Sequence, residues 1–326
     1  MEPDLYPLRF RPVYKNYFWG GDRIVRVFGR GAPPGVYAES WEIADRPDGM
    51  SVAINGPLAG RTLRELTETY GQDLTGTRAA GASFPLLVKL IDARERLCVQ
   101  VHPDEEDTRK HGGEPKTEVW YVLEVAPGAG VFAGLKPGTT EQKVRERLAS
   151  GTLPDQLRFM PVERGEAVFV PGGRIHSIGA GCLLLEVQQN SNTTYRLYDW
   201  DRRGPDGQPR PLHVESALRA ARWDDRDVVK PTPRLLDRAG KDERWEVFES
   251  RYFRLERLLL ESPYARRADR GSFRAIFVVS GSAEIVHAAG TESLAAGVTC
   301  LLPAVLNDAC LVPAGGRCEL LEITLP

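Results

Sequence analysis

The 326-residue chain lacks several features that mark specialised classes of protein. It has no run of about 18 apolar residues, so the sequence predicts no membrane-spanning helix. Its first 18 residues hold no apolar segment of the kind found in signal peptides. Basic residues number 43 and acidic residues 45, so the basic excess typical of nucleic-acid-binding proteins is missing. We therefore expect neither a membrane nor a nucleic acid as a partner.

Cysteine is also scarce. The five cysteines are an odd number, lie far apart and form no Cys-x-x-Cys pair. This pattern argues against a disulfide framework and against a zinc site built from cysteines. Free thiols are typical of a reducing compartment, and we therefore expect the protein in the cytoplasm.

Glycine and proline, by contrast, are frequent, with 32 and 24 residues. They separate short apolar runs that are rich in β-branched and aromatic residues, a pattern typical of an all-β sandwich or barrel. The clearest runs are Val119–Val125, Glu166–Val170, Cys182–Gln189, Phe253–Leu260, Ala275–Val279 and Cys318–Leu325. A charged segment around Pro231 and Pro233 then predicts a boundary between two β-rich domains, residues 1–230 and 240–326.

Two helices are expected within the first domain. The segment Thr62–Tyr70 has an amphipathic pattern, and a second helix is expected between residues 139 and 151. Thr139 and Gln142 have the spacing of a capping box at the start of that second helix.

A candidate metal site begins with the segment around Gln100 and His102. Side chains alternate between the two faces of a strand, so Val99 and Val101 point into a core while Gln100 and His102 point the other way. The simpler explanation is a strand end whose polar side chains face solvent, since Pro103 ends the strand.

Two further segments supply ligand types of the same kind. Lys116 and Glu118 share a face if the chain is extended there, and His176 follows a glycine-rich turn. Taken alone, these are more simply a surface ion pair and a turn histidine. Together with Gln100 and His102, they supply two imidazoles, one carboxylate and one carbonyl oxygen, which suits a nitrogen- and oxygen-bound metal ion.

A polar strand face is expected further along the chain. If the strand after Leu185 continues, Glu186, Gln188, Asn192 and Arg196 face the same side. Polar groups in a barrel interior require ligands or partners, although an amide-rich loop held by backbone hydrogen bonds explains the pattern equally well. The planar guanidinium of Arg196 suits the binding of an anion.

Seven stretches of the chain resemble one enzyme family. They are Tyr14–Gly21, Glu39–Ile43, Phe84–Leu90, Val99–Asp104, Lys116–Tyr121, Val170–Gly179 and Thr193–Arg202. Over residues 12–220 the chain resembles the type I mannose-6-phosphate isomerases, zinc-dependent cupin enzymes, in their short bacterial form. The resemblance implies a mainly β fold of two cupin-like β-barrel domains with helical insertions in the N-terminal part. The second domain would be a degraded cupin.

The resemblance also implies roles for individual residues. One Zn²⁺ per chain would be bound by Gln100, His102, Glu118 and His176. Arg196 would be the catalytic arginine, and Lys89 and Lys116 would contact the substrate. Lys116 is also a candidate catalytic residue because it shares a face with Glu118, and the further residues expected to contact the substrate are Cys98, Asn192 and, from its place on the polar strand face, Glu186. This chain departs from the family at Cys98, where serine is common, and at Asn192, where aspartate is common.

The expected reaction is the interconversion of mannose 6-phosphate and fructose 6-phosphate through an enediol. Zinc would stabilise the negative charge that develops on oxygen, and Lys116 is a candidate for the group that moves the proton. Two alternatives remain at this stage. One is a metal-binding cupin isomerase that acts on another sugar phosphate, and the other is a non-catalytic sugar-binding cupin. The sequence predicts no particular oligomeric state.

Overall fold

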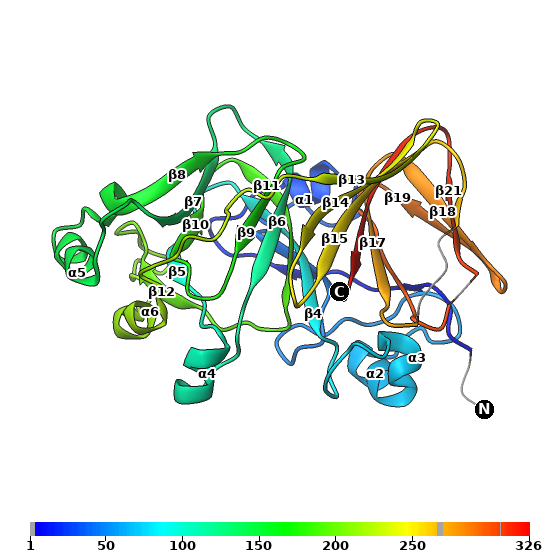
Figure 1. Ribbon diagram of the computed structural model, residues 1–326, viewed down its shortest axis with the longest axis horizontal. Helices are drawn as coiled ribbons and strands as arrows, with labels where there is room; N and C mark the ends of the chain where they lie inside the picture. Colours follow the sequence, from blue (N-terminus) through cyan, green and yellow to red (C-terminus); the bar gives the residue numbers. More distant parts are fainter. Residues whose placement is uncertain (1–3, 266–269, 307) are drawn as a thin grey trace. The chain divides into compact units, whose positions relative to one another are not determined.

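The computed structural model describes residues 4–265, 270–306 and 308–326, which form a mainly β protein with short helices (Figure 1). Its strands and helices form two compact units. Unit 1 contains the described residues of segments 1–13, 41–88 and 231–326, and unit 2 contains segments 14–40 and 89–230. The domain boundary expected between residues 230 and 240 stays a prediction.

Unit 2 holds all the candidate site residues that the sequence singled out, and two antiparallel sheets contribute to it. One sheet has the strand order β12 (Tyr195–Tyr198), β5 (Val99–Val101), β10 (His176–Ile178), β7 (Gly130–Leu135) and β8 (Leu157–Pro161). The other has the order β2 (Val13–Lys15), β3 (Glu39–Ile43), β4 (Leu86–Ala93), β11 (Cys182–Gln189), β6 (Glu118–Val125) and β9 (Ala167–Val170). Strands β2, β3 and β4 each continue along the chain from one unit into the other.

Unit 1 also contains two sheets. The larger has the order β1 (Leu8–Arg9), β20 (Thr299–Leu302), β17 (Arg274–Ser280), β22 (Cys318–Thr324), β15 (Arg254–Leu260), β14 (Asp242–Glu249) and β13 (Arg234–Ala239). The smaller has the order β16 (Tyr264–Ala265), β21 (Cys310–Pro313), β18 (Ser282–His287) and β19 (Gly290–Ala295). The mainly β prediction is confirmed, but within the described residues each sheet ends at edge strands and no ladder closes into a barrel.

Short helices connect the strands. They are α1 (Arg23–Arg26), α2 (Leu63–Tyr70), α3 (Gln72–Thr75), α4 (Glu105–His111), α5 (Glu141–Ala149), the 3₁₀ helix η1 (Leu153–Gln156) and α6 (Val214–Ala220). In unit 2, α6 packs on β12 and β5 (Figure 1). None of the helices among the described residues combines the length and the apolar character that crossing a membrane requires.

Both expected helices are present, and their caps explain where they begin. Thr62 and Glu65 form a capping box at the start of α2. The second expected cap is wrong by one residue. Thr140 caps α5 by accepting a hydrogen bond from the Lys143 amide, whereas the Thr139 hydroxyl donates to the side chain of Gln156. Two neighbouring threonines have the same intrinsic ability to cap a helix. Here the hydroxyl of Thr139 is used in the contact with Gln156, and Thr140 is the cap.

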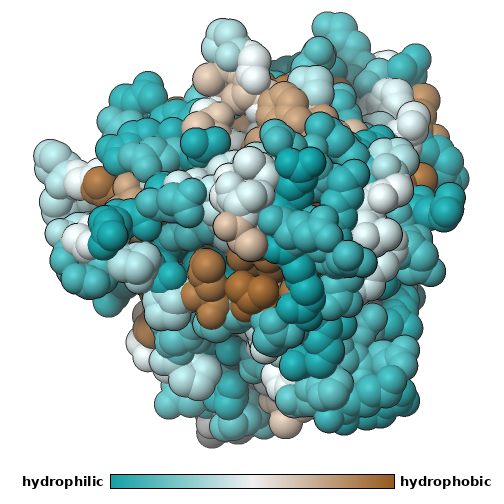
Figure 2. Space-filling model, turned by 90° about the vertical axis from the view of Figure 1, so that its left-hand side faces the viewer, coloured by the Kyte–Doolittle hydropathy of each residue, from teal (hydrophilic) through white to brown (hydrophobic). Residues whose placement is uncertain are grey.

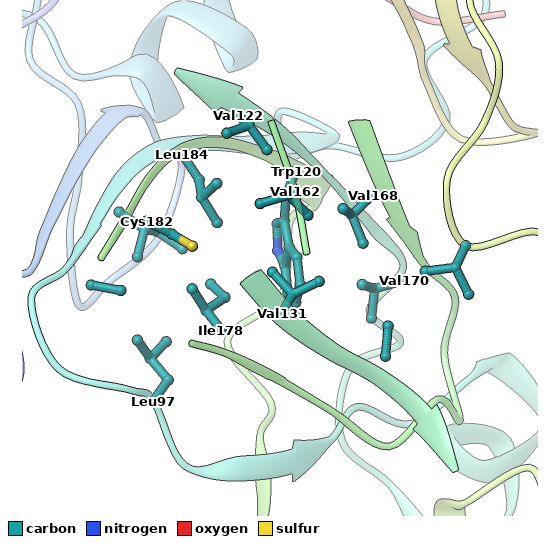
Figure 3. Packing of buried hydrophobic residues seen from close by; sticks show 14 of the residues in the cluster. Leu97, Trp120, Val122, Val131, Val162, Val168, Val170, Ile178, Cys182 and Leu184 are labelled. Atoms are coloured by element: carbon teal, nitrogen blue, oxygen red, sulfur yellow. The ribbon is translucent and has the colours of Figure 1, made fainter. Parts of the chain in front are cut away.

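The main hydrophobic cluster of unit 2 contains residues from both of its sheets. Figure 3 shows Trp120 among Val131, Ile178 and Leu184, which come from four different strands. All four side chains are buried. One face of the surface, drawn in Figure 2, is mostly hydrophilic and carries a small hydrophobic patch.

Two leucine truncations in unit 2 should lower the free energy of unfolding by different amounts. Leu184→Ala removes a fully buried side chain, and we expect the free energy of unfolding to fall by about 2–5 kcal/mol. Leu212→Ala is the matched control, because Leu212 is 46% exposed and its truncation should change stability by less than about 0.5 kcal/mol. Urea denaturation of both variants measures the difference, and equal losses would contradict this placement of the core.

Candidate metal centre and substrate cavity

Three strands of unit 2 carry core residues and site residues on the same face. Because side chains alternate along a strand, residues two apart point to the same side. On β6, Glu118 shares a face with Trp120, and on β11, Glu186 shares a face with Leu184. Trp120 and Leu184 belong to the hydrophobic cluster. Both glutamates are also buried, but they lie outside that cluster. On β4, Lys89 and Ile91 repeat the pattern.

Strand register brings segments that are distant in the sequence together around these charged residues. In one sheet, Gln100 on β5 lies opposite His176 on β10 and opposite Arg196 on β12. In the other sheet, Glu118 lies opposite Gln188 on β11. Candidate residues of the two sheets meet in a single site, because Glu118 of the second sheet faces His176 of the first.

His102, Glu118 and His176 form a fully buried cluster that could bind a metal ion. One potential ligand atom from each residue lies within 4.8 Å of the others. The Glu118 carboxylate oxygens lie 3.6 Å from His102 Nε2 and 3.5 Å from His176 Nε2. These separations exceed hydrogen-bond length, and His102 Nε2 and Glu118 Oε1 make no hydrogen bond within the described structure.

Backbone carbonyls set the orientation of both imidazole rings. The Nδ1 atom of His102 lies 2.9 Å from the carbonyl oxygen of Thr193, and that of His176 lies 2.8 Å from the carbonyl of Arg174. A carbonyl only accepts, so each Nδ1 carries the proton and each Nε2 presents a lone pair to the cluster. This is the outer-shell arrangement that orients histidine ligands of metals.

The protonation states favour metal binding as well. Burial lowers the pKa of His102 well below its ordinary value, with Lys116 adding to the effect, and burial lowers the pKa of His176 to about 3. Both rings are therefore neutral at pH 7. Burial and the neighbouring Glu186 raise the pKa of Glu118, with Lys116 opposing them, and a bound divalent cation would further favour its charged form. The residues fit a metal ion.

Gln100 lies next to this cluster but presents its amide nitrogen to it. Nε2 of Gln100 is 3.2 Å from Nε2 of His176, and the Cys98 thiol donates to Oε1 at 3.3 Å. A half-turn of the amide would exchange the two atoms and offer the oxygen as a fourth ligand. Its role as a ligand therefore stays a prediction.

A buried network of charges borders the cluster. Lys116 Nζ lies 2.7 Å from Glu118 and 3.6 Å from Glu186, while Lys89 Nζ lies 3.0 Å from Glu186 and 3.5 Å from Glu39. The indole of Trp120 donates to Glu186 at 2.8 Å. Burial alone would raise the pKa of Glu186, but the two lysines lower it below its ordinary value. Lys89 also stays charged, because Glu186 and Glu39 outweigh its burial and raise its pKa.

Glu39, Lys89, Lys116 and Glu186 line a cavity of about 300 Å³. It also contains Cys98, Asn192 and Arg196, so the structure brings together all the residues expected to contact the substrate. Burial raises the pKa of the Cys98 thiol, against the opposing effect of Arg196 and Arg210. Gln188 does not line the cavity; its side chain donates to the backbone carbonyls of Gln189 and Ser191.

The cavity residues to which the sequence assigns no role include four with polar or aromatic side chains: Tyr17, Trp19, Glu39 and Arg210. Three of them lie in stretches that carry the family resemblance, which is a signal that could have pointed to them. Arg210 lies between two prolines in a loop and gave no such signal.

Comparisons with known proteins agree with this architecture. Residues 8–121 match the sequence profile of the type I phosphomannose isomerase catalytic domain. The probable mannose-6-phosphate isomerase GmuF of Bacillus subtilis is 34% identical over 319 residues, which cover 96% of this chain and 98% of the relative. A second B. subtilis protein, mannose-6-phosphate isomerase ManA, is 40% identical over 214 residues, 65% of this chain and 67% of its own.

A solved structure extends the likeness over nearly the whole fold. The crystal structure of a mannose 6-phosphate isomerase from B. subtilis superposes with a TM-score of 0.87 at 30% identity, over 97% of this chain and 99% of that one. The family resemblance found in the sequence is therefore confirmed, together with the cupin fold that it implies. From its sequence, its fold and its buried histidine and glutamate cluster, the chain belongs to the type I phosphomannose isomerase family.

Proposed function

We propose that this protein is a zinc-dependent isomerase that interconverts mannose 6-phosphate and fructose 6-phosphate. The observation that carries the proposal is the His102–Glu118–His176 cluster beside a cavity lined by Lys89, Lys116 and other cationic side chains. Family membership makes the protein an isomerase, and the cationic groups suit an anionic sugar. The five cysteines, all in the described part of the chain, are free thiols, which supports the cytoplasm as the proposed location.

The metal would be bound by His102, Glu118 and His176, with Gln100 as the fourth ligand after its amide turns. Neutral imidazoles and a carboxylate are common ligands of zinc, and no thiolate is needed. When bound, zinc supplies Lewis-acid stabilisation for the negative charge that develops on a substrate oxygen.

The protein's own residues would bind the sugar and move the proton. Lys89 keeps its charge between Glu39 and Glu186, so we assign it an electrostatic role towards the substrate. Lys116 is the proposed group that moves the proton between C2 and C1, since it lines the cavity beside the metal ligand Glu118. Arg196 would bind an anionic group of the substrate through its guanidinium fork.

Metal content tests the proposed zinc site. We expect about one zinc ion per chain in protein purified without chelator or added metal, measured by elemental analysis. His102→Ala should reduce metal affinity by more than about 100-fold, because the loss of an outer-shell partner alone costs about 10- to 100-fold. His111→Ala is the matched control, since His111 is exposed and lies outside the cluster. Wild-type protein without bound metal would contradict the proposal.

Substrate choice tests the reaction. Purified protein should convert mannose 6-phosphate to fructose 6-phosphate, lose that activity with a chelator and regain it with zinc. A panel of other aldose phosphates distinguishes the proposed substrate from a different sugar phosphate, a possibility raised by Cys98. A metal-loaded protein that converts none of them would support the sugar-binding alternative.

The guanidinium fork of Arg196 can be tested without changing charge. Arg196→Lys should lower kcat/KM for mannose 6-phosphate about 10- to 100-fold, because a hydrogen bond to a charged group contributes about 1.5–3 kcal/mol. Zinc content, measured on the same preparation, should stay at the wild-type level. Near wild-type activity in this variant would show that Arg196 does not bind the substrate in the proposed way.

A further inference from the structure

Unit 2 contains a second cavity, of about 370 Å³, and among the described residues none lines both this cavity and the substrate cavity. Of its lining residues, Ile175 belongs to a second hydrophobic cluster, which also contains Val101, and Trp223 packs against that cluster. Val101 follows Gln100 on β5, and Gln100 lies opposite His176, so Val101 points away from the metal cluster. This rear cavity and the metal cluster therefore lie on opposite faces of one sheet.

The lining of the rear cavity carries an excess of positive charge. Its charged residues are Lys136, Arg158, Arg222, Arg226, Asp224 and Asp225. The carboxylate of Asp225 accepts hydrogen bonds from the guanidinium groups of Arg174 and Arg222. Within the described residues, the side chains of Lys136, Arg158 and Arg226 form no ion pair, and Asp224 is the single lining carboxylate in the same position. Three cationic groups against one carboxylate suit an anionic ligand.

Trp223 gives the rear cavity an aromatic wall. The ring is partly buried and packs against the hydrophobic cluster that contains Ile175. A flat aromatic group of a ligand gains free energy by stacking on such a ring. Cavities of a few hundred cubic ångströms bind small organic molecules. The lining therefore favours a ligand with an aromatic part and an anionic end, which is the chemistry of a nucleoside monophosphate.

A buried arginine attaches the loop of Trp223 and Arg226 to the body of unit 2. Arg174, which is 1% exposed, donates to the Asp225 carboxylate through Nε at 2.6 Å and through Nη2 at 2.9 Å. Its Nη2 also donates to the carbonyl of Asp227 at 2.9 Å. The loop over residues 222–227 is therefore tied to the residue that lies two positions before His176.

The residues just before His176 connect the rear cavity with the metal cluster. The amide of Arg222 donates to the carbonyl of Gly173 at 2.8 Å. The carbonyl of Arg174 accepts the hydrogen bond from His176 Nδ1 at 2.8 Å. Ile175, between them, lines the cavity. The loop that forms one wall of the rear cavity thus holds the backbone that orients a residue of the metal cluster.

We propose that the rear cavity binds a nucleoside monophosphate and is an effector site of the metal centre. Trp223 would contact the base, and Lys136, Arg158 and Arg226 would bind the phosphate. A phosphate bound by Arg226 restrains the loop over residues 222–227 and, through Arg174, the ring of His176. The site goes beyond the proposed function, because the isomerisation itself needs no second anion.

Calorimetry with AMP tests the site on the purified protein. We expect about one AMP per chain. In Arg226→Gln the dissociation constant of AMP should rise about 10- to 100-fold, because a hydrogen bond to a charged group is lost. Arg226 is exposed, so this variant should fold like the wild type. Arg109→Gln is the matched control, since Arg109 is an exposed arginine of α4 outside the cavity, and it should change the constant less than about threefold.

The aromatic wall has its own control. Trp223→Leu should weaken the binding of AMP about 5- to 150-fold, because stacking on an aromatic side chain contributes about 1–3 kcal/mol per base. The same variant should bind inorganic phosphate as the wild type does. A wild type that does not bind AMP would overturn the site. AMP binding that neither Arg226→Gln nor Trp223→Leu weakens would place AMP elsewhere and would also overturn it.

Metal affinity tests the effector role. The dissociation constant of zinc, measured on the metal-loaded protein by competition with a chelator, should fall about fivefold or more at saturating AMP, which is the lower end of typical allosteric couplings. Arg226→Gln at the same AMP concentration should show no such fall, and this excludes an effect of zinc bound to free AMP. Equal zinc dissociation constants with and without AMP in the wild type would overturn the effector role.

Discussion

Charge compensation inside unit 2 is the constraint on which the site depends. Lys89, Lys116, Glu118 and Glu186 are all buried, and an isolated charge in such a place would be strongly destabilising. Each is tolerated because the others lie within ion-pair distance. Removal of one partner would leave an uncompensated buried charge, so the strands that carry these residues are coupled through the site. Glu118 is the member least compensated, and it is also the carboxylate that faces the two imidazoles.

The hydrophobic core and the site of unit 2 share the same strands, and this explains why the site can be rigid. Strands β4, β6 and β11 carry apolar side chains into the core and, two residues away on the same face, a charged side chain into the site: Lys89 and Glu186 line the cavity, and Glu118 belongs to the metal cluster. The close-packed core therefore sets the positions of the charged groups. Trp120 connects the two regions directly, since its ring packs in the core and its indole nitrogen donates to Glu186.

Residues behind the site restrict the conformations of those in it. Backbone carbonyls hold His102 and His176 in the tautomer that a metal requires, and Asp199 holds Arg210 at the cavity edge. For the two histidines, the carbonyl uses the Nδ1 donor and leaves the Nε2 lone pair facing the cluster. Preorganisation of this kind lowers the cost of binding a metal ion or an anion.

The sequence by itself determined the mainly β class, six of the strands, the family and the main candidate residues. Alternation and turn residues are local signals, and they placed β11 at Cys182–Gln189 and predicted the helix that became α2. Tertiary structure decided the rest, because those features depend on contacts between distant segments. Only strand register shows that Gln100 lies opposite both His176 and Arg196, and only the packing of Thr139 moved the cap of α5 to Thr140. Arg210 gave no local signal, because its position depends on Asp199 and on a loop held against β12.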